Sequence, residues 1–352
     1  MSIVTNAQIH RLSLGAMIAA CASAFAVSAA FAQTARRPAA SPVAATTVTG
    51  SQSFQKSNDW TVGVAGGLLE GTFIRFAAEL AKVLDDGPNL RVIPMVTFGA
   101  VGNVEDLLFL KGVDIAITQA DVLEHFKKED KSGNIDKRIN YIMRFFQTEA
   151  HIYARPEIKR IEDLAGKKVN FNVPGTAGVL TGGIIFDRLG VVPEKVFLNQ
   201  AIALEKMRTG EISAIVHLVG KPNDLFAKFK PEPGFHFLPI EYSDKFADFY
   251  VPTEITSEDY PNLMAPGEKV QSIGVATVLA VYNWPKGSDR HRRVQRFIEH
   301  LFARFDRFQQ PPFQPKWKEM NLAATVPGWN RYPTAEELLA KYLPETPPER
   351  SP

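Results

Sequence analysis

Two hydrophobic periods alternate along this chain, and their order predicts its class of fold. Short apolar runs at residues 60–64, 91–96 and 114–118 are typical of buried strands. Each is followed by a loop and a segment with helical apolar spacing, most clearly over residues 73–84. Beyond Arg155 the same order restarts, which predicts an α/β protein with largely parallel sheets. There we expect strands at 169–172, 195–198, 212–218 and 234–240, and helices at 179–189 and 203–208.

The chain is expected to pass twice between two lobes. The first passage falls near residues 148–155, between expected strands at 141–146 and 151–154. The second falls near residues 272–281, within a strongly apolar run, and an amphipathic helix over residues 292–308 follows it. A double crossing of this kind suits hinge closure around a ligand.

Composition and charge narrow the class of protein and its partners. A chain of 352 residues is longer than one hydrophobic core usually accommodates, so two lobes are the default expectation. The apolar fraction of 45% and the charged fraction of 22% are those of a soluble globular protein. A net charge of +2 implies neither nucleic acid nor an anionic membrane as a partner.

The N-terminal segment is predicted to direct export. After Arg11, an apolar stretch of small residues leads to Ala32, which completes an A-x-A pattern for signal peptidase. Two alternatives stay open: a lipid anchor on Cys21, which follows a lipobox-like triplet, and a retained membrane helix. Cys21 is the only cysteine, so cleavage after Ala32 leaves no disulfide. The expected divisions are a signal peptide at 1–32, a disordered linker at 33–57, lobe 1 at 58–152 and 273–310, lobe 2 at 153–272, and a Pro-rich extension at 311–352 packed on lobe 1.

Two glycine-bearing loops are the strongest candidates for a binding site. The loop Pro-Gly-Thr-Ala-Gly at residues 174–178 follows an expected strand and opens an expected helix, and residues 66–72 do the same earlier. Such a turn leaves backbone N–H groups without partners, so it is a natural seat for an anionic group. One loop in each lobe predicts a site that closes on a small ligand. The alternative is that these glycines only permit tight turns and close packing.

Polar side chains at other strand ends extend the predicted site. Thr97, Gly99 and Asn103 follow the second strand, at the sheet edge where open α/β sheets bind ligands, with helix capping as the alternative for Asn103. Gln119 follows the third strand, and its amide both donates and accepts. Arg155, at the first crossing, would grip a carboxylate through two N–H groups, unless it is an exposed charge. The predicted ligand-binding residues are Gly66, Gly67, Gly71, Thr72, Thr97, Gly99, Asn103, Gln119, Arg155, Gly175, Thr176, Ala177, Gly178, His217 and Lys221.

Six segments in this order resemble the TAXI family, the extracytoplasmic solute receptors of tripartite ATP-independent periplasmic (TRAP) transporters. The resemblance covers residues 59–301 and rests on GGLLEGTF (66–73), TFGAVGN (97–103), VDIAITQAD (113–121), IEDLAGKK (161–168), PGTAG (174–178) and MRTGEI (207–212). It implies a two-lobed periplasmic-binding-protein fold of type II. It also implies a small carboxylate or amino acid in the cleft and delivery to a TRAP-type membrane permease.

The sequence departs from that family at two loops. Leu68, Leu69 and Glu70 replace small and polar residues and bring a negative charge to the first loop. His217 and Lys221 are atypical in the later loop, where they would complement a negative ligand, with a structural role as the alternative for the histidine.

Enzymes and sensors are the other classes considered. The chain has no Gly-x-Ser-x-Gly motif, no Walker loop and no His, Cys or carboxylate cluster with metal-ligand spacing. We therefore expect no catalytic residue, no metal and no cofactor. A ligand sensor or adaptor built on the same fold stays open.

Overall fold

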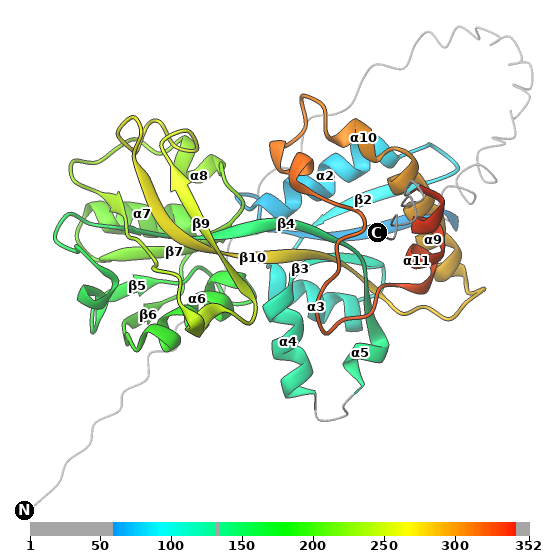
Figure 1. The fold of residues 1–352 in the computed structure, drawn as a ribbon, viewed down its shortest axis with the longest axis horizontal. Coiled ribbons are helices and arrows are strands. Elements are labelled where there is room, and N and C mark those ends of the chain that lie inside the picture. The colour runs from blue at the N-terminus through cyan, green and yellow to red at the C-terminus, as the bar shows by residue number, and fades with distance from the viewer. Residues whose placement is uncertain (1–58, 131–133, 343–352) are drawn as a thin grey trace, which may run out of the picture. The chain divides into compact units, whose positions relative to one another are not determined.

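One mixed sheet of ten strands forms the centre of the fold. The computed structural model describes residues 59–130 and 134–342 (Figure 1). The predicted signal peptide, the predicted linker and residues 343–352 of the extension lie outside the described residues. Along the sheet the strands follow the order β2-β1-β3-β10-β4-β7-β5-β6, with β8 beside β4 and β9 beside β10.

The elements within the described ranges have the following bounds. The strands are β1 (Thr61–Gly67), β2 (Arg91–Val96), β3 (Ile115–Gln119), β4 (Ile139–Ala154), β5 (Lys168–Asn170), β6 (Glu194–Val196), β7 (Ala214–Val219), β8 (His236–Phe237), β9 (Tyr250–Thr256) and β10 (Lys269–Tyr282). The α-helices are α2 (Thr72–Leu84), α3 (Ala100–Phe109), α4 (Ala120–Glu129), α5 (Ile135–Arg138), α6 (Ala177–Leu189), α7 (Gln200–Arg208), α8 (Asp224–Ala227), α9 (Asp289–Ala303), α10 (Phe305–Phe308) and α11 (Pro333–Tyr342). Three short 3-10 helices are η1 (Ile161–Leu164), η2 (Asp244–Phe246) and η3 (Pro315–Glu319).

The outer strands of the sheet are parallel and the central strands are antiparallel. β1 runs parallel to β2 and β3, and β5 runs parallel to β6 and β7. β10 is antiparallel to β3, β4 and β9, and β4 is antiparallel to β7. The α/β class is confirmed, whereas the prediction of largely parallel sheets is wrong for the centre. Two long strands that pass in opposite directions through the middle impose antiparallel pairing there.

β4 and β10 are the two connections between the halves of the fold. We call the half around β1–β3 lobe 1 and the half around β5–β7 lobe 2; they lie on the right and left of Figure 1. Glu149 of β4 pairs with Gly274 of β10 and with Val219 of β7, so it lies where the strands enter lobe 2. The predicted double crossing is therefore confirmed.

Three element predictions need correction. The strands expected at 141–146 and 151–154 are one continuous strand, β4, and the strand expected at 234–240 shrinks to β8. The helix expected over 292–308 is interrupted at Arg304, whose backbone leaves the helical region (φ −116°, ψ 14°). β9 was not expected, because Pro252 weakens a strand pattern; the structure accommodates it because β9 pairs only with β10.

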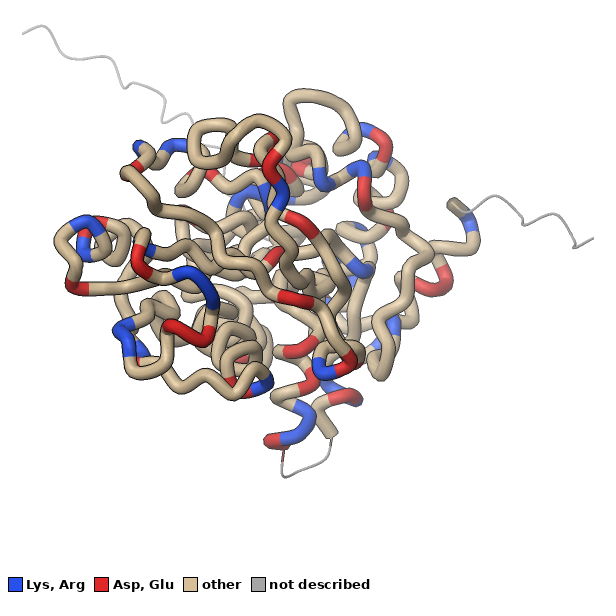
Figure 2. The backbone as a smooth tube through the Cα atoms, turned by 60° about the vertical axis from the view of Figure 1, so that its left-hand side comes forward, with Lys and Arg blue, Asp and Glu red and all other residues tan. Residues whose placement is uncertain are grey.

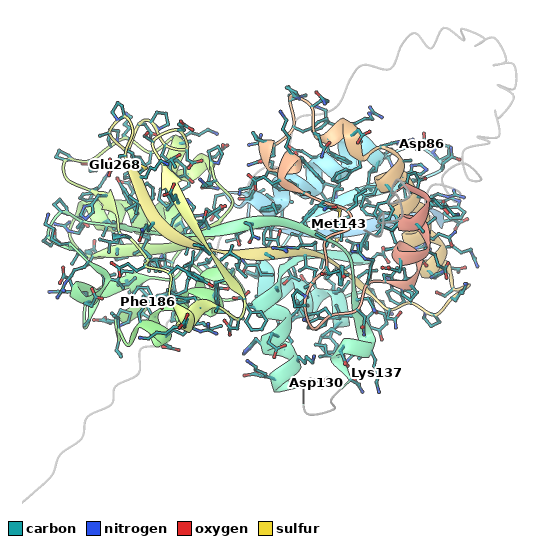
Figure 3. All side chains as sticks on the ribbon, viewed as in Figure 1. Asp86, Asp130, Lys137, Met143, Phe186 and Glu268 are labelled. Atoms are coloured by element: carbon teal, nitrogen blue, oxygen red, sulfur yellow. The ribbon has the colours of Figure 1, made fainter. Side chains whose placement is uncertain are left out.

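Apolar side chains fill the space between the sheet and its helices in both lobes. Met143 of β4 and Phe186 of α6 are fully buried, whereas Asp86 and Glu268 are exposed at the periphery (Figure 3). Acidic and basic residues are interspersed on the side of the molecule shown in Figure 2.

The C-terminal segment packs into lobe 1. Trp317 of η3 is fully buried, and its ring centroid lies 4.2 Å from that of Phe308 and 5.0 Å from that of Phe76 in α2. Its Nε1 donates to Glu79 Oε2 at 2.6 Å, and the same carboxylate accepts from the Gln314 N–H. Residues 311–320 thus supply core side chains rather than a loose surface strap.

Candidate ligand-binding pocket

A pocket lies where α2 of lobe 1 and α6 of lobe 2 begin. Its volume is about 50 Å³, which is small beside the roughly 300–1,000 Å³ of pockets for drug-sized ligands. A volume of this size suits a compact solute. Its lining residues are Gly67, Leu68, Glu70, Gly71, Thr72, Phe73, Phe98, Gly99, Ala100, Asn172, Thr176, Ala177, Gly178, His217, Leu218 and Val219.

Both helices begin at the pocket without a side-chain cap. α2 starts after Gly71 and α6 starts after Thr176, and each of these flanking residues has an extended backbone. The Thr176 hydroxyl donates to the Val173 carbonyl at 2.8 Å and so leaves the helix start open. N–H groups of a first helical turn have no acceptor inside the helix, and the helix dipole makes this end positive. Two such ends at one pocket favour an anionic group there.

The start of a third helix, α3, is already occupied. The N–H groups of Val101 and Gly102 both donate to the Gly175 carbonyl at 3.0 Å. Gly175 is not among the lining residues, and its carbonyl joins the lobes, while contact of its N–H with a ligand stays a prediction. Its φ of +87° and the 2.8 Å that would separate an added Cβ from Phe98 Cβ explain why glycine stands here.

Further hydrogen bonds hold the lobes together beside the pocket. Thr72 Oγ1 donates to the Gly220 carbonyl at 3.3 Å and accepts from the Gly220 N–H at 3.0 Å. Glu70 Oε1 accepts from Asn199 Nδ2 at 2.5 Å, and the Glu70 carbonyl accepts from Asn223 Nδ2 at 3.0 Å. Together with the α3 contact, these bonds describe a closed cleft.

His217 lines the pocket at the end of β7 and carries no charge. The residue is 5% exposed, and its Nε2 has no hydrogen-bond partner among the described residues. Burial, and to a smaller degree the neighbouring His151, lower the pKa of His217 to about 3. The neutral ring therefore offers one donor and one acceptor, and no positive charge, at physiological pH.

Asn172, which is not among the predicted site residues, contributes to the lining. Its backbone has a φ of +68°, a left-handed conformation that Asn tolerates better than most residues. Its Oδ1 accepts from the Val173 N–H at 2.8 Å, so the side-chain amide stays beside the start of α6. The Asn-Val-Pro-Gly order is a turn signal that would have moved Asn172 from the expected strand into the loop.

Three predicted residues of lobe 1 lie outside the pocket lining and hold its loops in place. The fully buried Asn103 amide donates to the carbonyls of Gly66 and Ile117 at 2.8 and 2.7 Å, and its Oδ1 accepts from the Thr97 hydroxyl. An added Cβ on Gly66 would lie 2.8 Å from Ile74 Cα, so close helix packing explains that glycine. Asn103, Thr97 and Gly66 thus fix the loops rather than face the pocket.

Gln119 takes part in a buried contact between the lobes. Its Nε2 donates to Thr148 Oγ1, and its Oε1 accepts from Thr181 Oγ1 of α6 at 3.3 Å. The Thr181 hydroxyl also lies 2.7 Å from Asp121 Oδ2, which accepts from the Tyr250 hydroxyl at 3.0 Å. The amide that was expected to bind a solute is committed to the closed arrangement.

Arg155 and Lys221 have other partners outside the lining. Arg155 Nε donates to Glu157 Oε1 at 2.7 Å, and its Nη1 donates to the Met207 carbonyl. Lys221 Nζ pairs with Asp259 Oδ2 at 2.8 Å. The structure therefore assigns neither cation to the pocket, where Glu70 carries the one formal charge among the lining residues.

Within residues 59–130 and 134–342, no helix has both the length and the apolar character needed to cross a membrane. Within the same ranges, no three His, Cys, Asp or Glu side chains are placed to hold a metal ion.

Comparison with known proteins places the chain in a family. The model of the NMT1-like family matches residues 66–292, so the chain belongs to the NMT1-like family. Similar solved structures include a mutant of ArgBP from T. maritima, with 16% identity over 72% of this chain and 94% of that chain and a TM-score of 0.39. Another is an amino acid ABC transporter substrate-binding protein from Streptococcus pneumoniae bound to L-arginine, with 11% identity over 76% and 98% of the two chains and a TM-score of 0.42.

Proposed function

We propose that this protein is an exported receptor that captures a compact monocarboxylate between its lobes and delivers it to a TRAP-type membrane permease. The observation that carries the proposal is the meeting of two uncapped helix starts, α2 and α6, at one small pocket. The resemblance to the TAXI family supports the permease as partner and the periplasm as location. No chemical change of the solute is part of this function.

The chemistry of the lining defines the solute more closely. No Lys or Arg lines the pocket, so a single carboxylate is to be held by backbone N–H groups, with the neutral His217 and Asn172 beside them. A second carboxylate on the solute would find no cationic side chain in the lining and would be repelled by the negative charge of Glu70. An ammonium group on the solute would bring three N–H donors. Its one anionic partner in the lining would be Glu70, whose Oε1 already accepts a hydrogen bond from Asn199. Leu68, Phe73 and the other apolar lining residues suit a short hydrocarbon body.

A panel of small solutes tests the proposal. Acetate, propionate and butyrate should raise the unfolding temperature in a saturable way, because a ligand that binds only the folded state stabilises it. Propionamide, which lacks the charge, and succinate, L-alanine and sulfate should have much weaker effects. Stabilisation by succinate or L-alanine alone would overturn the monocarboxylate assignment, whereas no saturable response from any solute would contradict a receptor for small anions. NMR of the incubated solute should show no conversion.

Replacing Thr176 by Asp should abolish this binding and keep the fold. An Asp at the N-cap of α6 would accept from the first-turn N–H groups and bring its own carboxylate into the place of the solute. We expect the unfolding temperature without ligand to stay unchanged or to rise, while the propionate affinity falls at least about tenfold, the equivalent of one charge-assisted hydrogen bond. Thr176→Ser, which keeps the hydroxyl, is the matched control. Undiminished propionate binding by Thr176→Asp would remove α6 from the site.

A further inference from the structure

Lys316 of the C-terminal segment reaches the point where the two lobes join. It belongs to η3 and is 2% exposed. Its side-chain carbons pack beside Gly220, where an added Cβ would lie 3.2 Å from Lys316 Cδ and Cε. The residue thus lies between lobe 1, which anchors η3 through Trp317 and Glu79, and the loop that follows β7.

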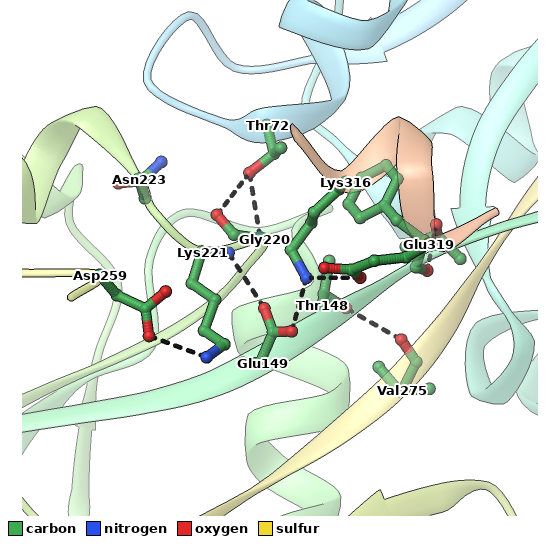
Figure 4. A network of polar contacts seen from close by, with 12 residues as sticks. Thr72, Thr148, Glu149, Gly220, Lys221, Asn223, Asp259, Val275, Lys316 and Glu319 are labelled. Carbon is green, nitrogen blue, oxygen red and sulfur yellow. Dashed lines mark hydrogen bonds and ion pairs between the residues drawn. The ribbon is translucent and has the colours of Figure 1, made fainter. Parts of the chain in front are cut away.

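The ammonium group of Lys316 pairs with a carboxylate on the crossing strand. Lys316 Nζ lies 2.7 Å from Glu149 Oε1, and both side chains are 3% exposed (Figure 4). Glu149 is the β4 residue that pairs with both β10 and β7. A buried pair of this kind is weak support for stability, because desolvation offsets the attraction, and its best-attested use is to fix one arrangement.

The same carboxylate continues the connection to the pocket. Glu149 Oε2 accepts from the Lys221 N–H at 3.0 Å, which fixes the loop after β7. The preceding residue, Gly220, exchanges two hydrogen bonds with Thr72 Oγ1 at the start of α2. Figure 4 shows this series of contacts from Lys316 through Glu149 and the Gly220–Lys221 loop to Thr72.

We propose that Lys316 and Glu149 form a latch that holds the lobes closed and so positions the solute pocket. The latch makes the C-terminal segment a determinant of solute affinity although none of its residues lines the pocket. Its effect on affinity rests on the proposed function, whereas its effect on closure does not.

Several charged and titratable groups surround Glu149. Lys316 and Lys221 face the carboxylate, and their own further partners are Glu319 Oε2 at 3.3 Å and Asp259 Oδ2 at 2.8 Å. His151 Nδ1 lies 2.9 Å from the Glu149 carbonyl oxygen, and its Nε2 lies 2.9 Å from the Tyr260 hydroxyl. Burial raises the pKa of Glu149 to about 7 against the opposing effect of Lys316. The ionised carboxylate that pairs with Lys316 therefore forms as the pH rises through about 7.

Closure is measured directly by spin labels on the two lobes. Val96→Cys in lobe 1 and Ile202→Cys in lobe 2 are exposed label sites, and Cys21, the one native cysteine, is replaced by Ser. Without solute, Lys316→Met should shift the label–label distances to a longer, broader distribution, whereas Lys318→Met, on an exposed neighbour, should not. If closure falls to about a tenth of molecules, apparent propionate affinity falls about tenfold.

The double variant Lys316→Met with Glu149→Gln separates a latch from a purely structural role. Removing both charges should restore the unfolding temperature that the single change lowers, yet leave the distance distribution long. Unchanged distances in both folded variants would overturn the latch. Longer distances without any solute binding would retain the latch and contradict the receptor function instead.

Discussion

Trp317→Ala should lower the free energy of unfolding by about 3–5 kcal/mol, the usual effect of truncating a buried Trp. The indole is fully buried against Phe308 and Phe76, and its Nε1 is a hydrogen-bond donor to Glu79. The change therefore leaves both a cavity and a buried carboxylate with one donor fewer. Urea unfolding of the full chain gives the free energy directly.

Two controls separate packing from the hydrogen bond. Trp317→Phe fills most of the space and should lose only about 1–3 kcal/mol, from the missing donor. Lys318→Ala, on the exposed neighbouring residue, should stay within about 0.5 kcal/mol of the parent protein. A Trp317→Ala variant as stable as the parent would show that the C-terminal segment is not part of the lobe 1 core.

Glu149→Gln should remove a pH-dependent loss of stability of about 3 kcal/mol. Burial raises the pKa of Glu149 from 4.5 to about 7, so between these pH values the folded state binds more protons than the unfolded state. Stability from this group is then fully present below pH 4.5 and declines as the pH rises to about 7. The size of this loss of stability follows from the pKa difference between the folded and unfolded states, at about 1.4 kcal/mol for each pKa unit.

The difference between the two proteins isolates this residue from other titrating groups. Unfolding free energies at several pH values should show the parent falling relative to Glu149→Gln from pH 4.5 to 7, with no further divergence above about pH 8. Parallel profiles would mean that Glu149 titrates alike in both states and that the buried pair is fully charged throughout.

The sequence predicted the class of fold because hydrophobic period is a local property. Alternating strands and helices, and the two apolar segments that cross between lobes, follow directly from it. The antiparallel centre depends on which distant strands meet, as at Glu149 and Gly274, and no local pattern reports that pairing. The edge strand β9 was not predicted from the sequence, because Pro252 argues against a strand unless its edge position is known.

The structure brings several predicted loop residues to one pocket and gives other predicted side chains partners elsewhere. Gly71, Thr72, Thr176 and Gly178 do line one pocket, because a glycine-bearing turn at a helix start has a recognisable pattern. Gln119 and Arg155 were selected for their chemistry, yet partners distant in sequence engage them. The pairing of Lys316 with Glu149 joins residues 167 positions apart, so only the fold reveals it.

A crystal structure of the full chain with propionate tests the central claim most directly. We expect one solute in the pocket, with its carboxylate oxygens about 3 Å from first-turn backbone nitrogens of both α2 and α6. Propionate bound elsewhere, or with its carboxylate turned away from both helix starts, would contradict the account.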